Sequence, residues 1–353
     1  MRWLRLASGR RVAVDGRMST RQRVIVFAIG VVLGITLLSL MPRPDRSERQ
    51  RHPWHEQTAP DGYYPLTVKD GFGREVVVER QPRWFISLAP SVTQMLFAMG
   101  MGDHLMAVTD YCDYPAGAVE IQQMGRSIGR MDTPDLERIL EFAPDIVLGS
   151  THTDIAIFRR LHNPPRTTAL ALRHDSMEDV FADIATLARV TGVPGKGARL
   201  LSDLRGRVAE AAAEVPLHET APRVLYLLGI DAGLSPGFAP GRGAWISDLI
   251  ERAGGESVTA RLAQQWGTPS PEALLDLAPE VLIVTDGRTP GEQEALRRRI
   301  ERLPRHGLWA EIPAVRENRI HIVDPDLFAI PGPRMPEMLE VLVQTIWQES
   351  GRY

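Results

Sequence analysis

Two stretches of the chain, 135 residues apart, repeat the same order of local signals. TPDLERILEFAPDIVL (133–148) and SPEALLDLAPEVLIV (270–284) each begin with a hydroxyl residue and a proline, continue as a helical pattern, and end with Ala-Pro and an apolar strand. We therefore expect Thr133 and Ser270 to be N-cap residues, with proline at the first helical position. Two related lobes would produce this internal repeat, although ordinary α/β units also resemble one another.

Strand and helix alternate through most of the chain, except in its middle. Strands that alternate with helices favour parallel sheets with helical crossovers. Residues 176–215 show only helical periodicity, and Gly192 to Gly197 are expected to kink it. The 353 residues are enough for two lobes. We predict an α/β fold with two Rossmann-like lobes and parallel sheets. The expected parts are an N-terminal lobe over 62–175, one connecting helix over 176–219 and a C-terminal lobe over 220–353.

The N-terminal segment carries an uncharged apolar run over residues 24–41, which seven arginines precede. At about 1.5 Å per residue, a helix of this length nearly crosses a hydrocarbon core of about 30 Å. Positive charge ahead of such a helix favours a cytoplasmic N-terminus and an exported body. We predict a basic cytoplasmic head over 1–23, a transmembrane anchor or signal over 24–41 and a tether over 42–61. An uncleaved anchor is favoured over a cleaved signal, and Met18 is an alternative start to Met1.

The net charge of −3 divides unevenly along the chain. Residues 1–51 contain eleven Arg and three acidic residues, a net charge of +8, which leaves −11 for the remaining 302 residues. An acidic body lacks the clustered cations that phosphate contacts need, so we expect no nucleic-acid partner. The single cysteine, Cys112, excludes an internal disulfide framework and a multi-cysteine metal site. The chain has no nucleophile elbow, P-loop or HExxH motif, which argues against an enzyme.

Three segments carry a family resemblance: PLTVKDGFGREVVVERQPRWFISLAPSVTQMLFAMG (65–100), VTDYCDYP (108–115) and TPDLERILEFAPDIVLGS (133–150). They resemble the substrate-binding proteins of ABC importers, in the subgroup that carries cobalamin, haem and iron–siderophores. The resemblance implies a class III periplasmic-binding fold with a rigid connecting helix and a ligand cleft between the lobes. It also implies a periplasmic or extracytoplasmic location, an ABC permease dimer with its ATPase subunits as partner, and no catalytic role or cofactor of its own.

Two glutamates occupy matching places in the repeated stretches. An offset of 135 superposes Glu137 on Glu272, near the start of each predicted helix, where the macrodipole favours a negative charge. In the cobalamin-binding members that the chain resembles, one glutamate of each lobe docks on permease arginines, and these positions match. A carboxylate–guanidinium pair is directional and bidentate, which suits recognition of a two-subunit partner. The alternative is that both are solvated glutamates at helix starts.

Ligands of open α/β lobes bind in the loops beyond the carboxyl ends of the strands. Tyr111 and Trp266 match aromatic residues of the cobalamin binders, and aromatic rings can sandwich a flat corrin or porphyrin. Where those proteins have a further tryptophan, this chain has Ile128. Arginines are suited to acidic ligand groups, and a histidine could ligate iron or cobalt. The candidates are Pro90, Ser91, Tyr111, Arg126, Arg130 and His152 in the first lobe, and Pro236, Trp266 and Phe328 in the second.

The sequence thus predicts an importer component that captures a corrinoid (cobalamin) or an iron chelate. A binder specific for haem or a siderophore is an alternative with the same fold. A membrane-anchored sensor ectodomain without a permease is an alternative from another class. Binding of bare zinc or manganese is disfavoured because the histidines are scattered, and we expect no metal site formed by the protein alone.

Overall fold

The computed structural model describes residues 2–5, 11–14, 60, 62–217 and 220–348, and the chain divides into two compact units, 1–57 and 58–353. In the first unit, β1 (Arg2–Arg5) pairs antiparallel with β2 (Arg11–Val14). The predicted anchor over 24–41, and the predicted tether apart from Pro60, lie outside the described residues. Within the described part of the chain, no helix has the length and apolarity that a membrane crossing needs.

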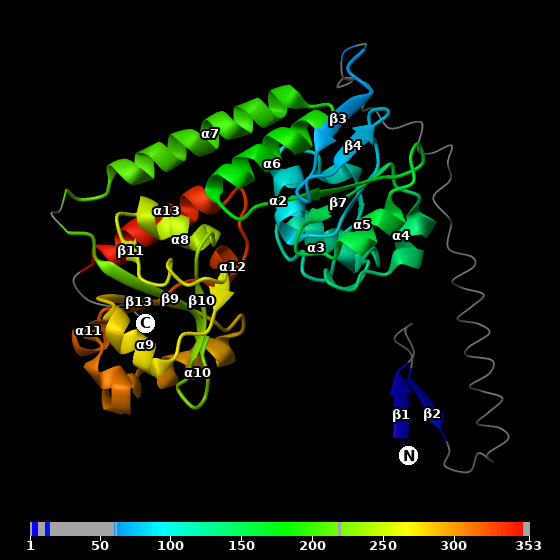
Figure 1. The fold of residues 1–353 in the computed structure, drawn as a ribbon. Coiled ribbons are helices and arrows are strands. Elements are labelled where there is room, and N and C mark those ends of the chain that lie inside the picture. Colours follow the sequence, from blue (N-terminus) through cyan, green and yellow to red (C-terminus); the bar gives the residue numbers. More distant parts are fainter. Residues whose placement is uncertain (1, 6–10, 15–59, 61, 218–219, 349–353) are drawn as a thin grey trace. The chain divides into compact units, whose positions relative to one another are not determined.

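The first lobe contains a four-stranded parallel sheet in the order β6-β5-β7-β8. Figure 1 shows this lobe with its helices α2, α3, α4 and α5. An antiparallel hairpin precedes the sheet, and its two strands are joined by a turn over residues 70–74. The parallel strands are almost wholly buried and apolar, because helices flank the sheet. The elements are β3 (Leu66–Lys69), β4 (Glu75–Val78), β5 (Phe85–Ser87), α2 (Pro90–Ala98), β6 (Leu105–Ala107), α3 (Ala116–Gln123), α4 (Leu136–Phe142), β7 (Ile146–Ser150), α5 (Ile155–Leu161) and β8 (Thr168–Leu172), with a 3-10 turn, η2 (Gly102–His104).

The second lobe has a mixed sheet, which corrects the prediction of a wholly parallel one. β11 (Glu256–Ser257), β9 (Arg223–Ile230), β13 (Val281–Thr285) and β14 (Ile320–Ile322) run parallel, whereas β10 (Pro236–Pro240) pairs antiparallel with β9, and the short β12 (Trp266–Gly267) pairs antiparallel with β10 at the edge of the sheet. The direction of β10 follows from a tight turn after β9. The Asp231 side chain accepts a hydrogen bond from the Ser235 amide, and the chain folds back on β9. The helices are α8 (Trp245–Arg252), α9 (Pro271–Leu277), α10 (Pro290–Ile300), α11 (Pro313–Arg316), α12 (Pro325–Phe328) and α13 (Met335–Ile346), with 3-10 turns η3 (Leu303–Arg305) and η4 (Gly307–Glu311).

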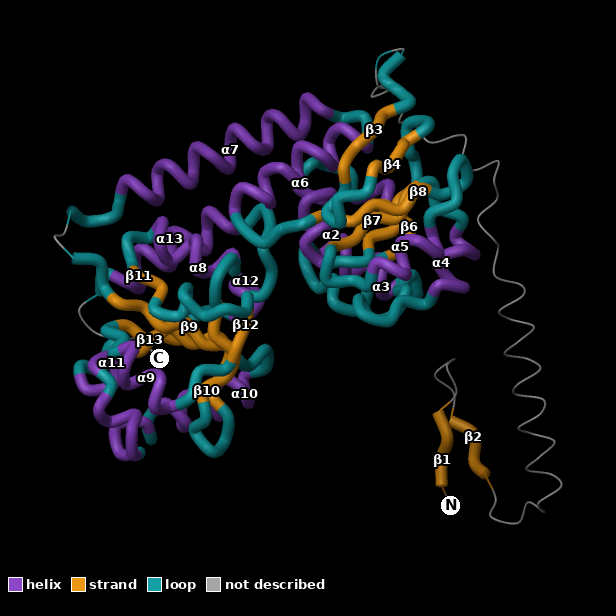
Figure 2. Tube along the Cα trace, viewed as in Figure 1, coloured by secondary structure: helices purple, strands orange, loops and turns teal. Residues whose placement is uncertain are grey.

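The connector consists of two helices, α6 (Met177–Val190) and α7 (Pro194–Ala213), instead of the one kinked helix predicted over 176–219 (Figure 2). Gly192 has a φ of +78°, a left-handed conformation that ends a helix readily, and Pro194 begins the next one. The glycines and the proline therefore produce a reversal rather than a kink. Helix α7 starts beside the first lobe, where Lys196 donates to the Gly100 carbonyl, and packs against α13 of the second.

The structure confirms the internal repeat and shows how closely its two copies agree. Helices α4 and α9 both have seven residues, and each ends at an alanine with positive φ, 48° at Ala143 and 35° at Ala278. Strands β7 and β13 then begin and end at positions 135 residues apart. One expectation is wrong, because Asp135 and not Thr133 caps α4, accepting from the Arg138 amide. The corresponding cap on α9 is Ser270, as predicted.

Candidate functional site

The loop after β6 in the first lobe holds the predicted aromatic contact. Tyr111 is 37% exposed, and the guanidinium carbon of Arg130 lies 5.5 Å from the centroid of its ring. Arg130 also pairs with Asp132 at 2.9 Å, and Arg126 is exposed. The structure therefore brings together Tyr111 and Arg130, two predicted ligand residues that lie on either side of α3 in the chain. Ile128 is fully buried and presents no side chain to a ligand.

Four residues that the sequence reasoning missed show that the second lobe meets this loop. Asp113 receives a hydrogen bond from Arg288 of the second lobe at 2.5 Å. Next to it, Arg334 stacks over the exposed ring of Tyr114, with its guanidinium carbon 4.1 Å from the ring centroid. The Tyr-Cys-Asp-Tyr spacing of residues 111–114 could have indicated Tyr114, whereas the two arginines are 174 or more residues away and leave no local signal.

The second lobe contributes an exposed aromatic residue that the sequence reasoning also missed. Phe238 in β10 is 57% exposed and lies directly opposite Leu228 of β9, which is 38% exposed. Cross-strand partners project to the same face of a sheet, so the pair forms a small apolar surface. Trp266 is half-buried in β12, where it pairs with Pro240 of the same β10 strand. The candidate that the sequence indicated in this segment is Pro236, two residues before Phe238.

Two predicted ligand residues of the second lobe are buried in the ligand-free structure. Pro236 belongs to β10 and is paired with Ile230, so it is not in a loop. Phe328 is 1% exposed, and its ring centroid lies 6.4 Å from that of Tyr226. The chain after β14 forms the short helix α12, capped by Asp324, and this turn directs Phe328 inward.

The predicted Pro90 and Ser91 are both buried at the start of α2, and Ser91 lies in a polar cluster. The Ser91 Oγ is 3.1 Å from Nε2 of His174, and Nδ1 of His174 is 3.3 Å from Oδ2 of Asp183 in α6. Burial raises the pKa of the Asp183 carboxyl to about 6, although the hydrogen bond from His174 opposes the shift. This order of contacts resembles that of a hydrolase triad, but Ser91 is only 2% exposed. The cluster therefore ties α2 to α6 and offers no accessible nucleophile.

The buried Asp183 predicts a specific pH dependence of stability. Because the folded protein binds this proton more tightly than the unfolded chain does, the free energy of unfolding falls as pH rises from about 4 to about 6. A pKa shift of this size contributes at most about 3 kcal/mol to the free energy of unfolding. We expect Asp183→Asn to remove this contribution, so that the variant gains stability relative to the wild type over this interval. Urea unfolding at several pH values measures it, with the exposed Asp276→Asn as control. Parallel curves for wild type and Asp183→Asn would contradict the assignment.

His152 lies after β7, as predicted, and one face of its ring stacks on the buried ring of His174, with 5.8 Å between centroids. Desolvation and the neighbouring His174 both lower the pKa of His152. A neutral imidazole is the form that ligates iron or cobalt. Among the described residues, no group of three or more His, Cys, Asp or Glu could hold a metal ion by itself. His152 could therefore serve only a metal that is already held in a chelate.

The paired glutamates occupy equivalent places in the two lobes. Glu137 and Glu272 are each the second residue of their helix, and both are exposed. Helices α4 and α9 each lead directly into a parallel strand and run opposite to it. Their N-termini therefore lie toward the carboxyl edge of each sheet, the edge whose loops hold the candidate ligand residues.

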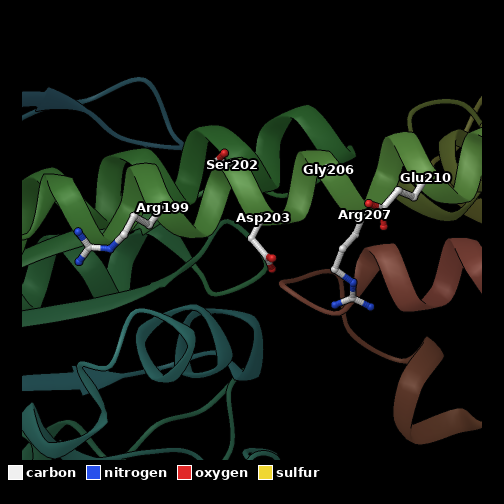
Figure 3. A pocket seen from close by; sticks show the side chains of 6 residues that line it. All are labelled: Arg199, Ser202, Asp203, Gly206, Arg207 and Glu210. Carbon is white, nitrogen blue, oxygen red and sulfur yellow. The ribbon is translucent and has the colours of Figure 1, made fainter.

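A surface groove runs along α7 and lies apart from these residues (Figure 3). It has a volume of about 450 Å³, and it is lined by the side chains of one helix: Arg199, Ser202, Asp203, Gly206, Arg207 and Glu210. The lining mixes both signs of charge, and Arg207 already pairs with Glu340 of α13 at 3.3 Å. The groove contains none of the predicted ligand residues, so it is not the candidate site.

Comparisons with known proteins agree with this architecture. The chain matches the family model described as periplasmic binding protein over residues 86–327. It is 23% identical over 292 residues to the uncharacterized ABC transporter substrate-binding lipoprotein YvrC of Bacillus subtilis, covering 81% of this chain and 87% of the relative. It is 26% identical over 257 residues to the vitamin B12-binding protein of Vibrio parahaemolyticus, and the match covers 70% of this chain and 84% of the relative.

A solved structure shows the same fold. The periplasmic haem-binding protein RhuT from Roseiflexus sp. RS-1 aligns with a TM-score of 0.63 at 23% identity. The alignment covers 76% of this chain and 98% of that protein. The agreement in fold over so much of both chains supports the two-lobed arrangement described above.

Proposed function

The chain belongs to the periplasmic binding protein family, and we propose that it captures a corrinoid or an iron chelate between its lobes for delivery to an ABC importer. Members of the family bind solutes and are not enzymes, which agrees with the inaccessible Ser91. The observation that carries the proposal is the exposure of aromatic side chains in both lobes, Tyr111 and Tyr114 in one and Phe238 in the other.

These aromatic residues suit a broad, flat ligand. A corrin or a porphyrin has two large apolar faces, and rings from opposite lobes can each cover one face. The contact of Arg334 with Tyr114 shows that the loop after β6 lies next to the second lobe. In this proposal Trp266 adds to the surface of Phe238, while Arg126 and Arg130 meet acidic groups at the ligand rim. His152 is then placed to ligate a cobalt or iron atom.

The partner that we propose is a permease dimer with its ATPase subunits. Glu137 and Glu272 are exposed at equivalent points of two related lobes, so they offer two like contacts to two like subunits. An arginine on each permease subunit could form a bidentate, charge-assisted pair with each carboxylate. We also propose an extracytoplasmic location with the segment over 24–41 as membrane anchor. In support, the Bacillus relative is described as a lipoprotein, although it is held by a different kind of anchor.

Visible spectroscopy tests the proposed ligand class. The full chain in detergent is incubated separately with cyanocobalamin, haemin and a ferric hydroxamate, desalted, and its spectrum recorded. We expect one of the three chromophores to be retained at about one per chain. Retention of none of them would overturn the proposal.

Substitution of Phe238 tests whether the retained ligand occupies the proposed cleft. Removing the ring in Phe238→Ala is expected to weaken binding by roughly 10-fold or more, because about 1.5–3 kcal/mol of apolar burial is lost. The matched control is Leu217→Ala, which removes an exposed apolar side chain after α7. Titration of the chromophore absorbance measures both affinities. Equal affinities for Phe238→Ala and the wild type would place the ligand elsewhere.

A further inference from the structure

The two lobes touch through charged and aromatic side chains beside the candidate ligand residues. Asp113, in the loop after β6, accepts a hydrogen bond from Nη1 of Arg288, which follows β13. Tyr114 lies under the guanidinium of Arg334, which precedes α13. Both contacts join neighbouring residues of the first lobe to arginines of the second.

A single segment of the second lobe holds both arginines in place. Nε of Arg288 lies 3.9 Å from Oδ1 of Asp326 in α12, and Nη2 of Arg334 donates to the Asp326 carbonyl. Each guanidinium thus has one side fixed on its own lobe and the other directed at the first lobe. An arrangement of this kind lowers the entropy that is lost when the lobes meet, because the arginines are already oriented.

We propose that Asp113–Arg288 and Tyr114–Arg334 form an interlobe latch that holds the lobes together without ligand. A separate set of contacts lies at the start of α6, where Glu178 pairs with Arg252 at 2.7 Å and the Met177 amide donates to Asp248. The contacts at α6 join the connector to the second lobe, whereas the latch joins the ligand-side loops. Opening the cleft therefore breaks the latch and can leave the α6 contacts intact.

The latch is weak and sensitive to salt. The side chains of Arg288 and Asp113 are 49% and 43% exposed, so water and salt screen their attraction. An exposed ion pair together with a partly exposed cation–π contact shifts a two-state equilibrium by roughly 10-fold. A latch of this strength favours the closed arrangement but lets the lobes separate when ligand enters.

Distances between spin labels test the latch in the ligand-free full chain. Labels are attached at Glu141→Cys in α4 and Asp276→Cys in α9, two exposed positions that correspond in the repeat. The native Cys112 is buried and burial raises the pKa of its thiol, so it should not react. Pulsed EPR then gives the populations of short and long interlobe distances.

We expect Arg288→Gln to increase the ratio of long to short distances by roughly 3- to 10-fold at low salt. Raising NaCl from low to roughly molar concentration should have a similar effect on the wild type. The control Arg261→Gln changes an arginine that is 91% exposed on the same lobe and should have no effect.

Two results would overturn the latch. One is a distribution that Arg288→Gln leaves unchanged at low salt, and the other is a wild-type distribution that does not respond to NaCl. Because no ligand is added, the outcome does not depend on which chromophore the protein retains, or on whether it retains one.

Discussion

Replacing Glu137 and Glu272 together by alanine should abolish most ligand uptake while leaving ligand affinity unchanged. Both carboxylates are exposed, so their loss removes no contact from the core. Each charge-assisted pair with a permease arginine is worth about 1.5–3 kcal/mol, and loss of two weakens docking by roughly 100-fold or more. The assay measures uptake of the retained ligand by cells in which the double variant replaces the native protein. Each single variant should show an intermediate loss.

The repeat supplies a matched control for the docking experiment. Glu141 and Asp276 are exposed carboxylates on the same two helices, again 135 residues apart. Glu141→Ala with Asp276→Ala changes the net charge by the same amount but leaves Glu137 and Glu272 in place, so uptake should remain near the wild-type level. Normal uptake by cells that carry the Glu137→Ala/Glu272→Ala protein would argue against docking through these residues.

The largest effect on stability is expected from Gly237→Ala in β10. A Cβ atom on Gly237 would lie 2.0 Å from the Leu228 carbonyl oxygen and 2.6 Å from that of Gly229. Both atoms belong to the backbone of β9, so only separation of the two strands could relieve the clash. We expect a loss of about 3 kcal/mol or more in the free energy of unfolding. Urea unfolding followed by circular dichroism measures it, and displacement of Phe238 should weaken ligand binding as well.

Gly206→Ala in α7 is the contrasting control. A Cβ atom there meets nothing within 4 Å, and the position is in the interior of a 20-residue helix. Alanine in a helix interior is more favourable than glycine by about 0.5–1 kcal/mol, so this variant should be slightly more stable. A Gly237→Ala protein as stable as the wild type would show that β10 does not pair with β9 as described.

Sequence reasoning succeeded where the signal is local. Residues that cap or end a helix act on backbone groups a few positions away, so the order of residues alone was enough to recognise the repeated helix and strand over 133–148 and 270–284. Even there, the cap of α4 is Asp135 and not the predicted Thr133, because two capping residues within three positions cannot be told apart from the sequence. The family resemblance singled out Glu137 and Glu272; the structure shows both exposed at equivalent positions, and their docking role stays a prediction.

Features that depend on the other parts of the molecule could not be predicted in this way. The turn at Asp231 decides that β10 runs antiparallel, and this pairing exposes Phe238 while it buries Pro236. Phe328 is buried because Tyr226, about 100 positions earlier, packs against it. Asp113 and Arg288 are 175 residues apart and meet only because the two lobes approach each other.

The sequence by itself thus determined the α/β class, the internal repeat and the family, because periodicity, capping and motifs act over short spans of chain. Only the tertiary structure decided which candidate side chains are exposed, which remain in the core and which join the lobes. The physical reason is that burial and contact depend on residues brought together from distant positions, and no single stretch of sequence contains both partners.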